Sequence, residues 1–285
     1  MVKVALGWKD YEIIATGDGQ KLERWGDLVL LRPDPQVIWH PKFNLNRYKG
    51  INAVYKRSSN GGGAWSNNAN MSFTVERKGL KFSLKLMGFK HTGLFPEQAV
   101  NWDQMQELIA KANRPIKVLN LFAYTGGATV ACAKAGAHVT HVDAAKAMVD
   151  RAKTNCKLSG VDEKNTRFIV DDCMKFIQRE IRRGNKYDAI IMDPPSYGRG
   201  ANGEVWKIED SLYDLVELTK DVLSDNVLFY LINSYTTGLQ PTVINNILTL
   251  VLGDRKGSIE SYEVALPTDE GILLPCGCSA MYKGK

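Results

Sequence analysis

The chain has 285 residues, of which 44% are hydrophobic and 24% are charged, a composition typical of one large globular domain or of a large domain with a smaller one. No apolar run approaches the roughly 20 residues that a membrane-spanning helix needs, and the early charges lead us to expect no signal peptide in this sequence. The five cysteines are scattered and odd in number, which argues against a disulfide framework. We expect a cytoplasmic protein with reduced thiols and no membrane partner. The oligomeric state stays open.

Positive charge gathers in the first third of the chain. The net charge is +6, but residues 42–90 contain ten Lys or Arg and one acid, Glu76, so ten minus one gives +9. Aromatic residues are interleaved with these bases. A charge run is often only a solvated face, but such a lopsided segment with aromatic rings is more typical of a polyanion-binding surface. We expect nucleic acid to bind here, with Lys81, Lys85 and Lys90 as candidate contacts.

Extended segments dominate the N-terminal part, in chain order before any clear helix. Several of them alternate polar and apolar residues, and residues 71–86 predict a hairpin that turns at Lys78-Gly79. Residues 91–115 contain one amphipathic helix and end in a loop. We therefore expect a β-rich, basic N-terminal domain over residues 1–90 that binds RNA or another substrate, followed by a connecting segment with one helix over residues 91–115.

From residue 116 onward, predicted strands and helices alternate with short links. Apolar runs such as KVLNLFAY and KYDAIIMD are each followed by a helical segment. This order predicts parallel strands with helices on both faces of the sheet. Two final strands without an intervening helix require at least one antiparallel strand. We expect an α/β fold over residues 116–285: a Rossmann-like, mostly parallel sheet whose last strand is antiparallel.

Glycines and acids follow the first three strands of this sheet, where open α/β folds bind ligands. FAYTGG (122–127) opens a helix whose N-terminus favours an anion. It is neither GxGxxG nor a Walker loop, so a nicotinamide oxidoreductase is the least favoured class. Asp143 ends the second strand and could accept ribose hydroxyls, or cap the next helix. Asp171 and Asp172 end the third, where a carboxylate could accept an adenine amine or again cap a helix.

In combination, the runs VLNLFAYTGG, VTHVDAAKAMVDRAKTN, RFIVDDCMKFI and YDAIIMDPPSY closely resemble class I S-adenosylmethionine-dependent methyltransferases. The likeness covers residues 71–285 and is greatest to the bacterial group that includes 23S ribosomal RNA methyltransferases acting on cytosine C5. The resemblance implies S-adenosylmethionine as the cofactor and a base of RNA, expected to be ribosomal RNA, as the acceptor. The first 70 residues do not resemble the small RNA-binding domain usual in that group, so RNA binding here rests on charge.

The resemblance also implies roles for individual residues. In such enzymes the first-strand loop holds the methionyl moiety, the second-strand acid holds the ribose, and the third-strand acid meets the adenine. HTGLFPEQ looks like the family's Phe-x-x-Gln element, which helps to hold the methionine end. The residues expected to bind the cofactor are Gln98, Phe122, Ala123, Tyr124, Thr125, Gly126, Gly127, Asp143, Ala144, Asp171, Asp172 and Cys173.

The stretch DPPSY follows the fourth strand and is the expected catalytic loop, although prolines also simply end strands. Prolines donate no N–H and fix φ, so the carbonyls before them point rigidly outward. With Asp193, these carbonyls could accept hydrogen bonds from a substrate amine while Tyr197 stacks on the base. We expect Asp193, Pro194, Pro195 and Tyr197 to be the catalytic residues, with Asp193 positioning the acceptor, and we name no general base.

The atom that receives the methyl group stays open at this point. Cytosine C5 becomes nucleophilic only after a thiolate adds at C6, yet the fifth strand ends in LINS, with Asn233 and Ser234 where that cysteine is expected. No cysteine of the chain is well placed. Transfer to a nitrogen or oxygen through orientation and a proton acceptor therefore fits the residues better.

The four histidines lack the spacing of metal ligands, so we expect the protein to bind no metal.

Two other functions remain open. One alternative is a methyltransferase of a small molecule or a protein. The other is a non-catalytic RNA-binding protein with a degenerate methyltransferase fold, which has no need for Asp143, Asp172 and Asp193 together.

Overall fold

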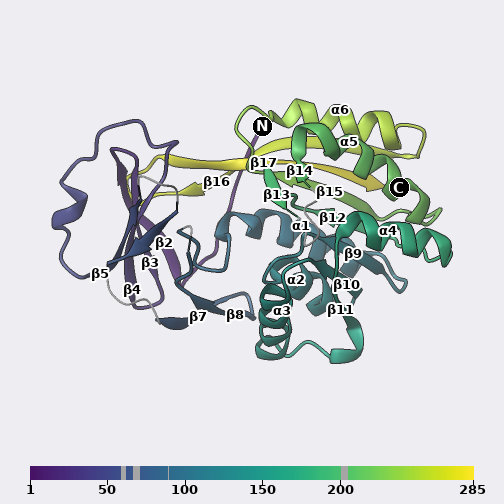
Figure 1. Cartoon of the computed structure of the whole chain (residues 1–285), viewed down its shortest axis with the longest axis horizontal. Coiled ribbons are helices and arrows are strands. Elements are labelled where there is room, and N and C mark those ends of the chain that lie inside the picture. Colours follow the sequence, from purple (N-terminus) through teal and green to yellow (C-terminus); the bar gives the residue numbers. More distant parts are fainter. Residues whose placement is uncertain (59–61, 67–70, 89, 200–204) are drawn as a thin grey trace. The chain divides into compact units, whose positions relative to one another are not determined.

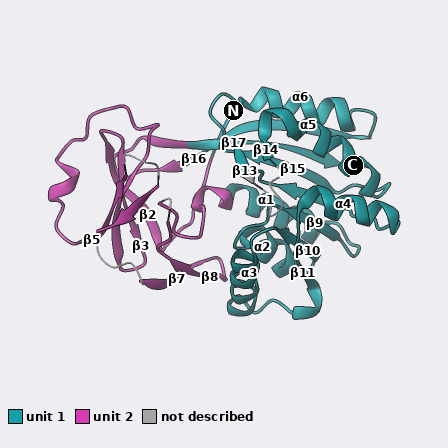
Figure 2. Cartoon of the chain, in the orientation of Figure 1, with its two compact units in different colours: residues 1–3, 100–264, 276–285 teal, residues 4–99, 265–275 magenta. Residues whose placement is uncertain are grey.

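The computed structural model describes residues 1–58, 62–66, 71–88, 90–199 and 205–285 (Figure 1). The chain forms two compact units (Figure 2). Unit 1 contains Met1–Lys3, Val100–Val264 and Cys276–Lys285, and unit 2 contains Val4–Ala99 and Ala265–Pro275. Each unit is therefore assembled from stretches that are far apart in the sequence.

The sheet of unit 1 has the strand order β1-β16-β17-β15-β12-β9-β10-β11. Strands β15, β12, β9, β10 and β11 are parallel to one another, whereas β17 is antiparallel to β15. This confirms the Rossmann-like, mostly parallel fold with an antiparallel last strand. The strands are β1 (Val2–Val4), β9 (Lys117–Leu121), β10 (His138–Asp143), β11 (Thr166–Val170), β12 (Ala189–Met192), β15 (Phe229–Ser234), β16 (Gly257–Pro267) and β17 (Leu273–Gly284).

Helices cover both faces of this sheet (Figure 1). Leu119 and Leu121 of β9 pack into a core formed with α4, α5 and α6. Asn120 lies between them in the sequence and bonds instead to Thr129 of α2, as the twofold alternation of a strand requires. No helix among the described residues is long and apolar enough to span a membrane. The helices are α1 (Ala99–Lys111), α2 (Gly127–Lys134), α3 (Lys146–Leu158), α4 (Cys173–Arg182), α5 (Ile208–Thr219) and α6 (Pro241–Leu252), with short 3-10 turns η3 (Glu163–Asn165) and η4 (Lys220–Val222).

The strand order reverses between β9 and β12. From β9 the chain proceeds through β10 to β11 on one side, and it later adds β12 and β15 on the other side. Ligands of open α/β sheets bind beyond the carboxyl ends of the strands at such a reversal. The loops after β9, β10, β11 and β12 lie at this edge and can therefore build a site.

Unit 2 is β-rich, as the sequence predicts for the N-terminal part. Its main sheet has the order β2-β3-β4-β5-β6, and β7 and β8 form a separate hairpin. Lys78 and Gly79 connect this hairpin with φ values of 49° and 79°, the left-handed pair of a tight turn, which confirms the predicted turn. The elements are β2 (Tyr11–Gly17), β3 (Gln20–Trp25), β4 (Leu28–Pro33), β5 (Ile51–Arg57), β6 (Gly63–Trp65), β7 (Ser72–Arg77), β8 (Leu80–Lys85) and the 3-10 turns η1 (Leu45–Arg47) and η2 (Pro96–Gln98).

A buried ion pair lies inside unit 2. Arg32 of β4 donates two hydrogen bonds to the fully buried carboxylate of Glu23 on β3. The Tyr11 hydroxyl donates a further bond of 2.9 Å to Glu23, and Arg32 also donates to the carbonyl of Lys90 at 2.8 Å. The charges satisfy each other within the unit, as a buried charge requires.

Candidate functional site

The loop after β9 has an unusual backbone. Phe122 and Tyr124 have φ values of 52° and 50°, in the left-handed region that bulky residues avoid. The loop is held from outside: Ala123 N–H donates to the Val142 carbonyl at 3.1 Å, and Asn155 of α3 donates to the Thr125 carbonyl at 2.9 Å. Backbone strain that neighbouring elements maintain is common at ligand sites.

The two glycines of this loop are required by packing. A Cβ on Gly126 would lie 2.8 Å from the Cβ of Ala152 in α3, and the φ of Gly126 is +84°. A Cβ on Gly127 would lie 2.7 Å from the ring of Trp102 in α1. Their missing side chains thus let α2 begin directly against α1 and α3. This adds a packing reason to the ligand approach that the sequence suggests.

Asp143 connects the first two strand ends. One of its carboxylate oxygens accepts the Tyr124 N–H at 2.8 Å, and the other accepts the Ala145 N–H at 2.8 Å. Burial raises the pKa of Asp143, and these two backbone hydrogen bonds oppose the rise. Each oxygen has a second lone pair, so the fixed carboxylate can accept from two adjacent hydroxyls, as a ribose presents.

The acids after β11 act within the protein. Asp172 caps α4 by accepting the Lys175 N–H at 2.9 Å, so its capping role is real. Asp171 accepts the Asp172 N–H at 2.9 Å and forms an ion pair with Arg179. Asp172 is the more exposed of the two, and Cys173 behind it is buried. Contact of this pair with adenine stays a prediction.

The loop after β12 is attached to the end of β15. The side-chain amide of Asn233 donates to Asp193 Oδ1 at 2.9 Å. Ser196 Oγ and Thr236 Oγ1 are hydrogen-bonded at 2.6 Å. The Pro195 carbonyl accepts the indole N–H of Trp206 at 2.6 Å, so this oxygen helps to hold the loop itself. Asp193 is thus a carboxylate with one oxygen fixed by a neighbouring strand.

Trp206 joins the two loops. It lies in β14 (Val205–Lys207), which pairs with β13 (Tyr197–Arg199) directly after the DPPS segment. Its ring lies 5.2 Å from the ring of Phe122, centroid to centroid, while its N–H bonds the Pro195 carbonyl. Tyr197 is 51% exposed, so its ring surface is accessible for stacking, a role that stays a prediction. Sequence reasoning missed Trp206, and it noted Asn233 only as the place where a cysteine is missing.

The structure brings most predicted site residues to one edge of one sheet. Residues 122–127, Asp143, Ala144, residues 171–173 and residues 193–197 follow the carboxyl ends of β9, β10, β11 and β12, which are adjacent strands of unit 1. Gln98 lies in η2 and belongs to unit 2, as do the three lysines. The roles of these four residues stay predictions.

Most, but not all, of the Lys and Arg side chains in residues 42–90 are exposed to solvent. Eight of the ten bases in residues 42–90 are exposed, Arg77 is buried, and Lys90 is half-buried. Lys81 and Lys85 are exposed on the same face of β8, and Lys81 lies 3.5 Å from Glu76. Lys90 donates to the Pro33 carbonyl at 3.2 Å, and desolvation lowers its pKa. Lys81 and Lys85 are therefore better placed than Lys90 to meet a polyanion.

The buried cysteines are poor nucleophiles. Burial raises the pKa of Cys132 and Cys173 far above the ordinary value, that of Cys156 to about 12 and that of Cys278 to about 11. Thiols with such values are protonated near neutral pH. Cys276, in β17, is partly exposed. Among the described residues, no cluster of His, Cys, Asp and Glu is arranged to hold a metal ion.

Comparison with known proteins agrees with this geometry. Residues 30–239 match the family model of S-adenosylmethionine-dependent methyltransferases. A crystal structure of a SAM-dependent methyltransferase from Agrobacterium tumefaciens aligns with a TM-score of 0.93 and 33% identity, covering 100% of this chain and 94% of that chain. A crystal structure of a protein complexed with SAH aligns with a TM-score of 0.76 at 21% identity, covering 97% of this chain and 76% of that chain, and it supports the fold alone.

Two curated relatives share part of their length with this chain. Ribosomal RNA large subunit methyltransferase I of Aeromonas salmonicida is 33% identical over 124 residues, which is 43% of this chain and 30% of the relative. Ribosomal RNA large subunit methyltransferase K/L of Shewanella baltica is 34% identical over 165 residues, which is 58% of this chain and 20% of the relative. The matched region thus spans less than a third of either relative.

The fold places this chain among Rossmann-like α/β proteins, whose ligands bind at the carboxyl edge of the sheet. The chain belongs to the S-adenosylmethionine-dependent methyltransferase family, as the family match and the Agrobacterium tumefaciens structure show. S-adenosylmethionine is accordingly its cofactor. The strained loop after β9 and the oriented carboxylate of Asp143 are suited to the methionyl group and the ribose of such a ligand, and these two assignments stay predictions.

Proposed function

We propose that this chain transfers the methyl group of S-adenosylmethionine to a base of RNA, and of ribosomal RNA in particular. The observation that carries the proposal is the position of Asp193. Its carboxylate is fixed by Asn233 at the same sheet edge as Asp143 and the loop after β9. A methyl donor held by those two elements would be presented toward an acceptor at the DPPSY loop.

The residues of the chain would act through orientation. S-adenosylmethionine supplies an electrophilic methyl group when it is bound. Asp193 would accept a hydrogen bond from an N–H or O–H group of the acceptor, and Tyr197 would stack on the flat base. The hydrogen bond between Trp206 and the Pro195 carbonyl would keep the loop in one shape during transfer. An acceptor atom held in line would form its bond to the methyl group as the methyl–sulfur bond breaks, and its proton would pass to a proton acceptor such as the Asp193 carboxylate or water.

A nitrogen or oxygen acceptor fits this loop better than cytosine C5. Addition of a thiolate to C6 is needed for C5, and burial raises the pKa of the cysteines at positions 132, 156, 173 and 278. Asn233 occupies the strand end where the cytosine-C5 group is expected to place its cysteine, and it is bonded to Asp193. Direct transfer to nitrogen or oxygen is therefore our choice.

RNA as the substrate is supported by two independent observations. The curated relatives named above are ribosomal RNA large subunit methyltransferases. Eight exposed Lys or Arg side chains lie within residues 42–90, the β-rich segment to which we assign RNA binding. Contacts between these side chains and RNA phosphates would give an affinity that does not depend on the RNA sequence. The same proposal places the protein in the cytoplasm, where its thiols stay reduced.

The test is methyl transfer from isotope-labelled S-adenosylmethionine. The purified chain is incubated with unmodified large-subunit ribosomal RNA, with a protein extract and with a small-molecule extract, each in turn. We expect label in RNA, on a base nitrogen or oxygen after nuclease digestion. Label in protein or small molecules alone would overturn the RNA proposal. Binding of S-adenosylmethionine without transfer to any of the three would favour a non-catalytic module.

A further inference from the structure

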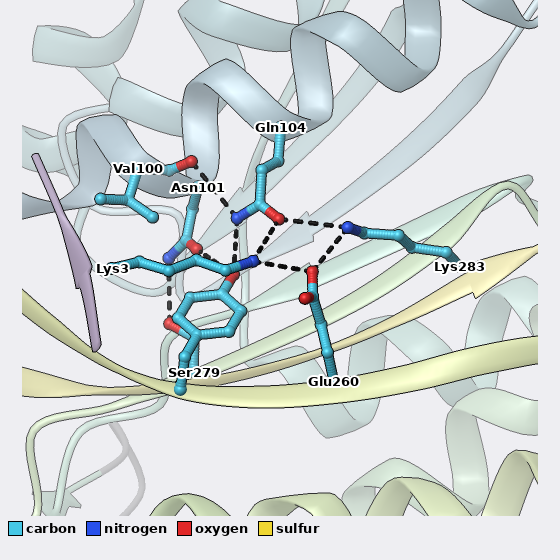
Figure 3. A network of polar contacts seen from close by, with 8 residues as sticks. Lys3, Val100, Asn101, Gln104, Glu260, Ser279 and Lys283 are labelled. Carbon is cyan, nitrogen blue, oxygen red and sulfur yellow. Dashed lines mark hydrogen bonds and ion pairs between the residues drawn. The ribbon is translucent and has the colours of Figure 1, made fainter. Parts of the chain in front are cut away.

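A continuous line of hydrogen bonds extends from Asp193 through the interior of unit 1. Asn233 donates to Asp193 and accepts from Ser279 Oγ at 2.8 Å. Asn233 and Ser279 are direct cross-strand partners on β15 and β17. Ser279 in turn accepts from the side-chain amide of Asn101 in α1 at 3.0 Å (Figure 3). The carboxylate at the sheet edge is thereby connected to a helix on one face of the sheet.

The line continues to two lysines. Asn101 Oδ1 accepts from the Tyr262 hydroxyl at 2.7 Å, and that hydroxyl accepts from Gln104 Nε2 at 2.9 Å. Gln104 Oε1 accepts from Lys3 at 2.8 Å and from Lys283 at 3.2 Å. Both ammonium groups also bond Glu260, at 2.8 Å and 2.5 Å (Figure 3).

The two lysines at one end fix the direction of every hydrogen bond in the line. Lysine can only donate, so the oxygen of Gln104 must face it and the nitrogen must face Tyr262. The Tyr262 proton must then point to Asn101, the Asn101 amide to Ser279, and the Ser279 proton to Asn233. The last donor is the Asn233 amide, which faces Oδ1 of Asp193. Bonds that all point one way polarise one another.

The middle of the line is shielded from water. Asn101, Ser279 and Tyr262 are 0% exposed and Asn233 is 1% exposed. Burial raises the pKa of Tyr262, so its hydroxyl keeps the proton that it donates. Burial alone would raise the pKa of Glu260, but its bonds to Lys283 and Lys3 lower it, which keeps this end ionised. The inner groups are too deeply buried to bond water instead. If the side-chain amide of Asn101 or Asn233 rotated by 180°, its two buried hydrogen bonds would therefore be lost.

The geometry points to Asn233, Ser279, Asn101 and Tyr262 as positioning residues of the methyl transfer: the line that begins at Lys3 and Lys283 holds the Asn233 amide as a donor and so fixes the Asp193 carboxylate. The inference rests on the proposed role of Asp193. A line with a purely structural role would join α1, β15, β16 and β17 and would affect stability alone. Its ending on Asp193, rather than on another structural group, is the reason to prefer a role in transfer.

Tyr262→Phe tests the line far from the site, and Tyr230→Phe is its matched control. Both tyrosines are fully buried, and each hydroxyl has a partner, but the Tyr230 hydroxyl bonds Thr219 and lies outside the line. We expect Tyr262→Phe to lower kcat roughly fivefold through looser positioning of Asp193, with unchanged affinity for S-adenosylmethionine. Tyr230→Phe should retain kcat. Equal kcat in the two variants at comparable melting temperatures would overturn the inference.

Ser279 allows a rescue experiment. Ser279→Ala removes the donor that orients Asn233, and it should lower kcat more than Tyr262→Phe because the lost bond is adjacent to Asn233. Ser279→Thr retains a hydroxyl and should recover most of the rate. A rate for Ser279→Thr that equals that of Ser279→Ala, in two variants that both melt as the wild type does, would contradict a role of the hydroxyl.

A second readout is independent of the acceptor. In the chain labelled with [15N]asparagine, the side-chain amide signal of Asn233 is assigned by its loss in Asn233→Ala. This signal should shift in Asp193→Ala and in Tyr262→Phe, but not in Tyr230→Phe. Such shifts without methyl transfer to RNA would leave the line intact and overturn only the proposed function. Transfer to RNA without a shift in Tyr262→Phe would overturn only the line.

Discussion

Both units bury polar groups, but the two clusters end in different ways. In unit 2, Glu23, Arg32 and Tyr11 form a closed group whose remaining bond goes to a backbone carbonyl. In unit 1, the line from Lys3 and Lys283 runs through buried amides and hydroxyls and ends on Asp193, in a loop at the ligand edge of the sheet. The first cluster neutralises its own charges, whereas the second delivers an oriented donor to a site.

Because of this difference, we expect the cluster of unit 2 to contribute to folding stability and the line of unit 1 to contribute to methyl transfer. A buried charge that loses its partner destabilises the fold strongly, because the remaining charge stays desolvated. A neutral amide that loses one neighbour costs less stability, but it can turn and release the group that it orients. Substitutions in the two clusters should therefore change different quantities, and the predictions below sharpen that contrast.

Asp193→Ala should have the largest effect on transfer. Loss of a group that orients the acceptor lowers kcat about 10²–10³-fold, by analogy with other preorganised site groups. Affinity for S-adenosylmethionine should stay near the wild-type value, since Asp143 and the loop after β9 are intact. Labelled-methyl transfer and calorimetric titration measure the two quantities. Loss of cofactor affinity instead would remove Asp193 from the acceptor site.

Glu23→Ala should have the largest effect on stability. Removing one partner of a buried pair leaves Arg32 uncompensated and costs about 3–5 kcal/mol, which calorimetric unfolding detects. Burial alone would raise the pKa of Glu23, but Arg32 and Lys21 lower it below the ordinary value. The pair therefore contributes its full stability above the pKa of the unfolded chain, and that contribution is lost as the pH falls through the folded pKa. An unchanged melting temperature would refute the closed-cluster interpretation.

Asp143→Ala should weaken the cofactor before anything else. Two hydrogen bonds to a charged acceptor are lost, which raises the dissociation constant of S-adenosylmethionine about 10–100-fold. Because burial raises the pKa of Asp143, wild-type affinity should be full at high pH and should decline as the pH falls through that raised pKa. Asp143→Asn should lose this pH dependence. Calorimetric titration with S-adenosylmethionine over a range of pH measures both effects. An unchanged dissociation constant in Asp143→Ala would exclude ribose binding by this residue.

The smallest effect is expected in unit 2. Replacing Lys81 and Lys85 together by Ala should raise the RNA dissociation constant about 3–10-fold and reduce the salt slope by about two, one for each phosphate contact. Lys157 and Lys164, exposed lysines of unit 1, give the control double variant. Equal weakening in both variants, measured by filter binding over a salt series, would mean that general charge and not this face binds RNA. Adding Lys90→Ala should contribute less, because Lys90 is half-buried.

Sequence reasoning succeeded where the pattern is local. Alternating strands and helices from residue 116 predicted the parallel sheet, and the acids at the strand ends were found because chain order places them at one edge. It did not predict the N-terminal hairpin of β2 and β3, although Asp18-Gly19, with φ values of 48° and 74°, is a strong turn signal between them. A register shift between Ile13 and Ala15 breaks the regular alternation of β2.

The support behind Asp193 was beyond a reading of the sequence. The residues of the line lie far apart in the sequence, as Lys3, Asn101, Asn233 and Ser279 show. Only the pairing of β15 with β17 and the packing of α1 bring them together. Each one alone resembles an ordinary buried polar residue. Trp206 is a similar case, since its role depends on the simultaneous contact with Phe122 and Pro195.

The most direct test of the central claim compares Asn233→Ala with Glu23→Ala in one experiment. For each variant, methyl transfer to unmodified large-subunit ribosomal RNA and the melting temperature are measured side by side. The account predicts that Asn233→Ala loses most of its transfer rate with a small change in melting temperature, whereas Glu23→Ala melts much earlier but transfers normally while folded. Normal transfer by Asn233→Ala would contradict the claim that the buried line of unit 1 serves the reaction.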